Sequence, residues 1–257
     1  MKKLVLLAMA FFICQQGFSQ KPEDTEVYTP VPPKVTPGKD CGAAPSDAIV
    51  LFDGKDLNQW VLSSDTTKTA DWIVKDNIIT VNKKSGNIQT KERFNNYQLH
   101  IEWRIPADID GTGQGRGNSG VFLASIGKGD AGYELQVLDN YENKTYTNGQ
   151  AGAIYKQGVP LANPSRKAGE WQSYDVIWTA PVFDASGKLV TPAYATVFFN
   201  GVLVQDHFEL KGPTKYIGQP SYEFAHGPSP IKLQAHGDKS KPISYRNIWI
   251  RPVVQPK

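Results

Sequence analysis

The stretch Gly132–Asn140 reads G-Y-E-L-Q-V-L-D-N, and its polar and apolar side chains alternate as in a half-buried β-strand. Glu134 and Gln136 point to one face, and the leucine and valine beside them point to the other. The pattern therefore predicts an acid and an amide side by side on an exposed face, with an apolar floor behind them. Asp139 rejoins that face only if a bulge shifts the register by one residue.

The rest of the chain also predicts short strands, and no window shows sustained helical periodicity. The Lys75-Asp76-Asn77 and Asn200-Gly201 segments predict tight hairpin turns between neighbouring strands. The expected strands are Trp72–Val74, Ile78–Val81, Tyr97–Ile105, Ser119–Ala124, Gln172–Trp178, Tyr194–Phe199, Val202–Gln205, Ile231–His236 and Ile243–Arg251. This pattern predicts an all-β fold, a two-sheet antiparallel sandwich.

The N-terminal segments predict an exported protein. Residues 1–19 combine two lysines, a short apolar run and small residues before the expected cleavage after Ser19, as in a secretory signal peptide. Residues 20–46 form a proline-rich tether, and residues 47–257 form the folded domain. Export would place the protein in the periplasm or outside the cell. Lipid anchoring at Cys14 is the lesser alternative, because the bulky Ile13 precedes it.

Charge and cysteine content exclude several classes of protein. Loss of the first 19 residues would leave 26 of the 28 basic residues against 25 acidic residues, so the mature protein would be nearly neutral. No basic patch or arm indicates a nucleic-acid partner. The apolar run of the signal peptide is too short to span a bilayer. Cys41 would be the one remaining cysteine, so no intrachain disulfide is expected and a real core must stabilise the fold.

Eight short motifs occur in order along the chain. They are L-F-D-G-K-D-L-N-Q-W at 51–60, N-S-G-V-F-L at 118–123, Y-E-L-Q-V-L-D at 133–139, G-A-I-Y at 152–155, G-E-W-Q at 169–172, F-N-G at 199–201, I-K-L-Q-A-H-G at 231–237 and Y-R-N-I-W-I-R at 245–251. Together they resemble the 3-keto-disaccharide hydrolase domain family over about residues 47–253. The resemblance implies a jelly roll of the concanavalin A-like lectin/glucanase type. The segment Ala107–Gly117 is longer than the usual loop of this family and is expected to alter the rim of the site.

The resemblance implies cleavage of glycosides whose C3 hydroxyl has been oxidised to a ketone. Such a ketone acidifies the C2 proton, so a base can remove it, the aglycone can leave from C1, and water can add afterwards. The expected substrate is an oligosaccharide or glycoside, and a sugar 3-dehydrogenase is implied as a partner. No cofactor is expected, and no cluster at metal-ligand spacing demands a metal ion.

Candidate residues come from alternate positions of the predicted strands. Glu134 or His236 is expected to be the base, and Gln136, Gln234 or Arg246 to donate hydrogen bonds to the sugar or the enolate. The substrate-binding set also includes Asn118, Asp139 and Tyr155.

Two other functions fit the same sequence. Glu134 and Asp139 have the spacing of the nucleophile and acid/base of a retaining β-glucanase, although the aspartate is one methylene shorter than the usual glutamate. A non-catalytic lectin-like module could instead bind glycans on aromatic platforms, for which the candidates are Trp60, Tyr155, Trp171 and Tyr222.

Overall fold

The larger of the two main sheets contains eight antiparallel strands in the computed structural model, which describes Thr29 and residues 33–253. Its strands are β1 (Ile49–Phe52), β3 (Ile73–Lys75), β4 (Ile78–Thr80), β6 (Tyr97–Arg104), β9 (Trp171–Thr179), β12 (Ala193–Phe199), β13 (Val202–Leu210) and β15 (Ser244–Pro252). Their order is β13-β12-β9-β6-β15-β4-β3, and β1 pairs with β15 outside this path. The predicted signal peptide, the lipid-anchoring alternative and residues 20–28 and 30–32 of the predicted tether lie outside the described residues.

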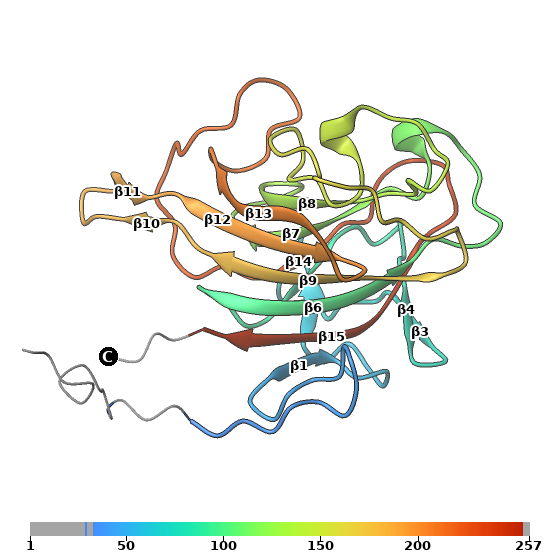
Figure 1. Cartoon of the computed structure of the whole chain (residues 1–257), viewed down its shortest axis with the longest axis horizontal. Helices are drawn as coiled ribbons and strands as arrows, with labels where there is room; N and C mark the ends of the chain where they lie inside the picture. The colour runs from blue at the N-terminus through green and yellow to red at the C-terminus, as the bar shows by residue number, and fades with distance from the viewer. Residues whose placement is uncertain (1–28, 30–32, 254–257) are drawn as a thin grey trace, which may run out of the picture. The chain divides into compact units, whose positions relative to one another are not determined.

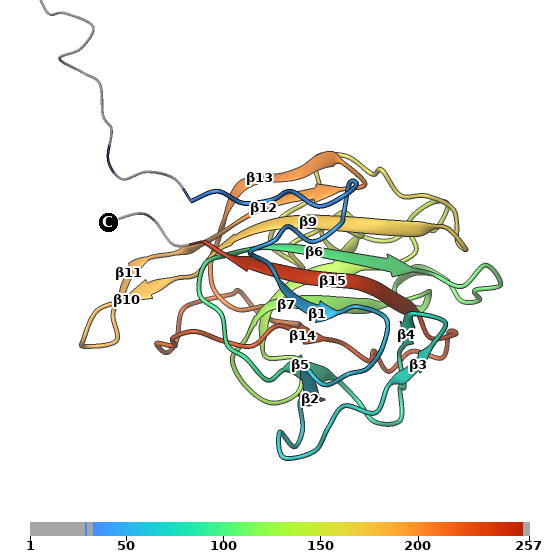
Figure 2. The ribbon, with the colours of Figure 1, turned by 90° about the horizontal axis from the view of Figure 1, so that it is seen from below.

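The smaller main sheet contains five strands in the order β2-β5-β14-β7-β8. They are β2 (Trp60–Leu62), β5 (Ile88–Thr90), β14 (Lys232–Leu233), β7 (Ser119–Ser125) and β8 (Gly132–Val137). The two sheets form separate layers, and β9, β6 and β15 lie side by side in the larger one (Figures 1 and 2). A short hairpin joins β10 (Val182–Phe183) and β11 (Leu189–Thr191), and two 3₁₀ turns occupy Gly113–Gly115 (η2) and Thr147–Gly149 (η3).

The all-β sandwich predicted from the sequence is thereby confirmed. No helix among the described residues is long and apolar enough to cross a membrane. Both predicted hairpins are present, since β3 pairs with β4 and β12 with β13. Asn77 and Asn200 have φ values of 61° and 50°, a left-handed conformation that asparagine tolerates in tight turns.

Aromatic and aliphatic side chains from both sheets fill the core. Trp103 and Tyr174 of the larger sheet pack with ring centroids 5.5 Å apart, and Tyr133 of β8 packs against Trp178 at 5.3 Å. The buried Tyr174 hydroxyl donates to the Gln136 carbonyl at 2.7 Å, which ties β9 directly to β8. This contact fixes the strand that carries Glu134 relative to the larger sheet.

The strand β8 differs from the sequence-based prediction because both of its faces are buried. Glu134 is 5% exposed and Gln136 is 1% exposed. Two distant segments cover this strand: Tyr155 N donates to the Glu134 carbonyl, and Glu134 N donates to the Thr214 hydroxyl. Alternation along one strand does not indicate which other segments pack against it. The prediction of an exposed face was therefore wrong.

The strand expected over Ile231–His236 is shorter than predicted. Only Lys232–Leu233 is regular strand, although Gln234 N still donates to the Gly120 carbonyl at 3.0 Å. Ala235 N instead donates to the side chain of Asn87, so the chain leaves the sheet at this point. The segment beyond it is no longer regular strand, and it carries His236 and Asp238.

Candidate active site

A row of three residues on neighbouring strands forms the floor of the site. Gln234, Gly120 and Gln136 are aligned through the bond from Gln234 N to the Gly120 carbonyl and through the pairing of Gly120 with Gln136. Gly120 leaves a gap between the two amides, and the Glu134 side chain lies in this gap. A Cβ atom at Gly120 would lie 2.5 Å from Glu134 Oε1, so only glycine leaves room for the carboxyl there.

A pocket of about 500 Å³ opens over this floor. Gly152–Tyr155 follows the outer edge of β8 through bonds with Glu134 and Gln136, and it places the Tyr155 ring at the pocket wall. Thr214 binds the same strand nearer its start and brings Tyr216 to the rim. The lining side chains are Gln114, Asn118, Asp130, Glu134, Gln136, Tyr146, Tyr155, Thr214, Tyr216, Gln234, His236 and Asp238.

The Glu134 carboxyl is the most strongly perturbed acid of this pocket. Burial raises its pKa, nearby Asp130 raises it further and Lys232 lowers it, which leaves a pKa of about 8. No side chain or backbone group among the described residues hydrogen-bonds to this carboxyl or pairs with it. An acid with a pKa near neutrality, free to meet a ligand, is suited to accept and return a proton.

Two phenols form part of the pocket wall. The Tyr146 and Tyr155 hydroxyls are hydrogen-bonded at 2.6 Å, and the Lys156 ammonium lies 5.9 and 5.7 Å from their ring centroids. Burial raises the pKa of both phenols, as does the negative charge of Glu134. Both phenols therefore stay protonated, and the pair has one hydroxyl proton left to donate to a ligand.

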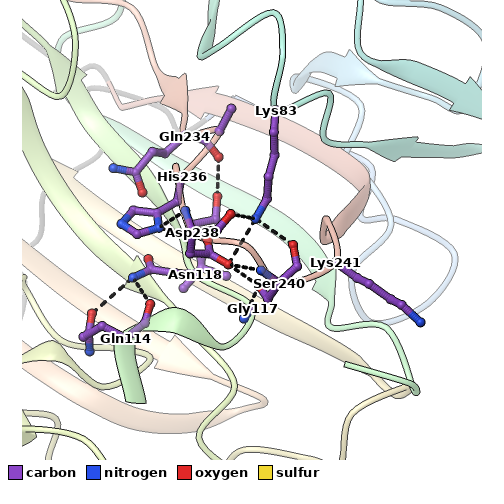
Figure 3. A network of polar contacts seen from close by, with 12 residues as sticks. Lys83, Gln114, Gly117, Asn118, Gln234, His236, Asp238, Ser240 and Lys241 are labelled. Atoms are coloured by element: carbon purple, nitrogen blue, oxygen red, sulfur yellow. Dashed lines mark hydrogen bonds and ion pairs between the residues drawn. The ribbon is translucent and has the colours of Figure 1, made fainter. Parts of the chain in front are cut away.

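His236 stands at the other end of the pocket, held by Asp238 (Figure 3). Its Nδ1 lies 2.9 Å from Asp238 Oδ2, while Asp238 also pairs with Lys83 at 3.1 Å and accepts a bond from the Ser240 hydroxyl. Burial alone would raise the pKa of Asp238, but the bonds from His236, Ser240 and Lys83 lower it well below its usual range. The carboxylate therefore stays charged and orients the ring, leaving Nε2 to meet a ligand.

Amide side chains complete the site. The Gln136 amide nitrogen donates to Asn118 Oδ1 at 2.9 Å and to the Ser119 and Val137 carbonyls, so it is fully engaged within the protein. Asn118 in turn donates to the Gln114 carbonyl at 2.9 Å, as Figure 3 shows. Gln234 Oε1 is buried and has no hydrogen-bond partner among the described residues. An unpaired buried amide oxygen at a pocket floor is a binding group for a hydroxyl donor.

The structure brings together six of the eight residues predicted from the sequence: Asn118, Glu134, Gln136, Tyr155, Gln234 and His236. Asp139 lies elsewhere, because β8 ends at Val137 and the aspartate turns to pair with Arg116 at 2.6 Å beside a separate cavity of about 470 Å³. Arg246 lies on the larger sheet, where it pairs with Glu102 at 2.6 Å. Neither residue lines the pocket of Glu134.

The four candidate aromatic platforms also divide into residues that line the pocket and residues that do not. Trp60 is fully buried and donates to the Leu51 carbonyl, so it is a core residue. The Trp171 ring lies against the guanidinium of Arg246, 4.1 Å from the ring centroid, and Tyr222 donates to the Leu210 carbonyl. Of the four candidates, only Tyr155 lines the pocket.

Sequence reasoning missed Gln114, Asp130, Tyr146, Thr214, Tyr216 and Asp238 as pocket residues. A signal existed for two of them. Gln114 belongs to the long Ala107–Gly117 segment that was expected to alter the rim, and Asp238 follows two residues after His236. The others come from loops whose path depends on the folded sheets. In the described part of the chain, no three His, Cys, Asp or Glu side chains are grouped so that they could hold a metal ion.

Comparison with known proteins places this fold in a family. Residues 47–251 match the model of the 3-keto-alpha-glucoside-1,2-lyase-like domain. A crystal structure from Parabacteroides distasonis, whose assignment as a glycosyl hydrolase is provisional, is 54% identical, with a TM-score of 0.83, and covers 91% of this chain and 97% of its own. Another structure from that organism, with the same provisional assignment, is 20% identical with a TM-score of 0.56, covers 80% of this chain and 99% of its own, and supports the fold alone. No curated protein matches. The chain belongs to the 3-keto-alpha-glucoside-1,2-lyase-like domain family.

Proposed function

We propose that the pocket cleaves 3-keto-glycosides by elimination across C1 and C2, with Glu134 as the base. The Glu134 carboxylate takes the C2 proton, and the electron pair of that bond moves toward the C3 carbonyl to form an enolate. The enolate then re-forms the ketone with a double bond between C1 and C2, while the C1–oxygen bond breaks. The leaving oxygen takes a proton, and water can add to the double bond afterwards.

The position of Glu134 is the observation that carries this proposal. Its carboxyl is buried at the floor of a sugar-sized pocket, with no protein partner among the described residues and a pKa of about 8. A base that must remove a weakly acidic C–H proton works best when its own pKa lies near the working pH. The family description, which names a 1,2-lyase-like activity on 3-keto-α-glucosides, agrees with this chemistry.

Other pocket residues supply the two proton-handling roles that remain. In its imidazolium form, with Nδ1–H donated to Asp238, His236 would donate its Nε2–H to the developing enolate oxygen. The spare hydroxyl proton of the Tyr146–Tyr155 pair is placed to protonate the leaving oxygen. These assignments make Glu134 the base and His236 the electrophilic donor.

The retaining-glucanase alternative has less support from this geometry. That mechanism needs two carboxyl groups that flank the scissile glycosidic bond and lie about 5–5.5 Å apart. Asp139 is instead paired with Arg116 and lines a different cavity, so it does not lie beside Glu134 as the acid/base of this mechanism would.

A substrate pair tests the proposal. Purified protein is mixed with a 4-nitrophenyl 3-keto-α-glucoside and with the unoxidised glucoside, and release of nitrophenol is followed. We expect release from the ketone alone, a slower rate when C2 carries deuterium, and a loss of about 10²–10⁴-fold in kcat for Glu134→Gln. Asp139→Asn serves as the matched control for removing a carboxylate. Release from the plain glucoside, or full activity of Glu134→Gln on the ketone, would contradict the proposal.

A further inference from the structure

A buried lysine lies beside the site and does not line its pocket. Lys232 is fully buried, and it shares a cross-strand row with Phe122 and Glu134, because β14 pairs Lys232 with Phe122 and β8 pairs Phe122 with Glu134. Since neighbouring strands lie about 4.8 Å apart, the backbones of Lys232 and Glu134 are about 10 Å apart along this row. The three side chains point to the same face of the sheet.

Lys232 is fully satisfied by the turn between β7 and β8. Its ammonium donates to the carbonyls of Gly127, Gly129 and Ala131 at 3.3, 2.7 and 3.0 Å, which uses all three N–H groups. It also lies 5.0 Å from the centroid of the Phe122 ring. Three carbonyl oxygens replace the water that the ammonium has lost, and they favour its charged form. Burial still lowers the pKa of Lys232 to about 8, while Asp130 and Glu134 raise it, so the ammonium is charged below that pH. With no free donor and no place in the pocket lining, Lys232 is not a group that touches substrate.

The same turn carries a charge of the opposite sign. Asp130 lines the pocket of Glu134 and accepts a hydrogen bond from Asn87 at 2.8 Å, and the carbonyls on either side of it are those that Lys232 binds. The lysine therefore fixes the turn that places this aspartate. Within the described residues, neither Lys232 nor Asp130 forms an ion pair with Glu134.

We propose that Lys232 and Asp130 are positioning residues that act on Glu134 through charge, without touching it, and so decide when its carboxyl loses its proton. This inference rests on the proposed role of Glu134 as the base. Phe122 lies between Lys232 and Glu134 in the cross-strand row, and its ring centroid is 5.0 Å from the ammonium. A direct ion pair would hold Glu134 in its charged state and engage the lone pair that must accept the C2 proton. Because the two charges do not contact Glu134, they still act on its carboxyl electrostatically and leave its lone pairs free to accept the C2 proton.

The two charges have opposite effects on the pKa of Glu134. Burial is the largest cause of the raised pKa, Asp130 raises it further and Lys232 lowers it. The other titratable groups that face the same pocket come from three further segments of the chain; they are Tyr146, Tyr155, Tyr216, His236 and Asp238. Burial raises the pKa of Tyr146 and Tyr155, so these two phenols are neutral in this range, and Asp238 is already paired with Lys83 and His236. Lys232 and Asp130 are therefore the charges whose removal should move the titration of Glu134.

A direct titration tests this inference. Glutamate labelled with ¹³C at the carboxyl is incorporated into the protein, the Glu134 signal is assigned by its loss in Glu134→Gln, and its shift is followed with pH. We expect Lys232→Met to raise the Glu134 midpoint and Asp130→Asn to lower it, each by about half a pH unit to one pH unit. On the rising limb of the pH–rate curve, a one-unit shift corresponds to a change of about tenfold in kcat/KM.

Lys128→Met is the matched control, because Lys128 is an exposed lysine of the same turn and does not line the pocket. Its Glu134 midpoint should equal that of the wild type. A folded Lys232→Met protein with an unchanged midpoint would overturn the inference. If Lys232→Met does not fold, Asp130→Asn decides, since a midpoint that stays or rises also overturns it. The titration needs no turnover, so a wild type that is inactive on the keto substrate would refute only the proposed function.

Discussion

Replacing Gly120 with alanine is the sharpest test of how the floor of the site works. The added Cβ would lie 2.5 Å from Glu134 Oε1, whereas an ordinary contact begins at 3.4 Å. The carboxyl must therefore move by about 1 Å. A displacement of this size at a reacting group lowers turnover by about 10²-fold, or about 2.7 kcal/mol in the activation free energy.

The same substitution should have little effect on folding. The atom that must move is the end of a flexible side chain, and Gly120 does not have a positive φ value, so alanine fits its backbone. Alanine also restricts the unfolded chain, which offsets part of any strain by about 0.4–1 kcal/mol. We expect the free energy of unfolding of Gly120→Ala to stay within about 1 kcal/mol of the wild type.

The assay compares kcat/KM on the 4-nitrophenyl 3-keto-α-glucoside with unfolding in urea for each variant. Gly227→Ala is the control, because no atom lies within 4 Å of its added Cβ and Gly227 does not line the pocket. It should keep both activity and stability. A folded Gly120→Ala protein with wild-type kcat/KM would refute the reasoning, because the position of the Glu134 carboxyl would then not matter to the reaction.

Three further predictions follow from the same contacts. Burial raises the pKa of Glu134 from 4.5 to about 8, so the folded state retains a proton that the unfolded chain has lost, and stability should fall as the pH rises from about 5 to 8. The Glu134→Gln variant should lack this fall of up to about 5 kcal/mol, and equal pH slopes in urea unfolding of the two proteins would contradict this. Tyr155→Phe removes the phenol bonded to Tyr146, so kcat should fall about tenfold for a substrate with an alkyl leaving group. The loss should be much smaller for the nitrophenyl substrate, because its leaving group needs no proton. Equal losses for both substrates would exclude the role of the tyrosine pair as the acid. Tyr174→Phe deletes the buried bond to the Gln136 carbonyl and should lower the free energy of unfolding by about 1 kcal/mol, and an unchanged urea midpoint would show that this contact adds no stability.

Much of the fold could be predicted from the sequence because its signals are local. Alternation at Tyr97–Ile105 separates an apolar set of side chains from a polar set, and β6 is observed at Tyr97–Arg104 with that pattern of burial except at His100, which is also buried. Asn200-Gly201 predicts the hairpin between β12 and β13 because few other residue pairs tolerate two successive left-handed conformations. These features depend only on neighbours along the chain.

The site could be predicted only in part. Glu134, Gln136 and Gln234 follow from alternation on their own strands, and the structure brings them together in one pocket. The positions of Asp139 and Arg246 could not be predicted in this way, because each depends on which oppositely charged residue folding brings near it. Those partners lie 23 and 144 residues away in the sequence.

Local patterns along the chain are thus enough to predict an all-β sandwich in which an acid and an amide share one face of β8. The burial of this face, in contrast, depends on tertiary contacts. The segments around Tyr155 and Thr214 close over β8 from distant parts of the chain, and Lys232 fixes the turn beside it. Alternation has a period of two residues, so it shows which face of a strand a side chain occupies but not what packs on that face. The loss of water that raises the pKa of Glu134 depends on every segment packed above that face.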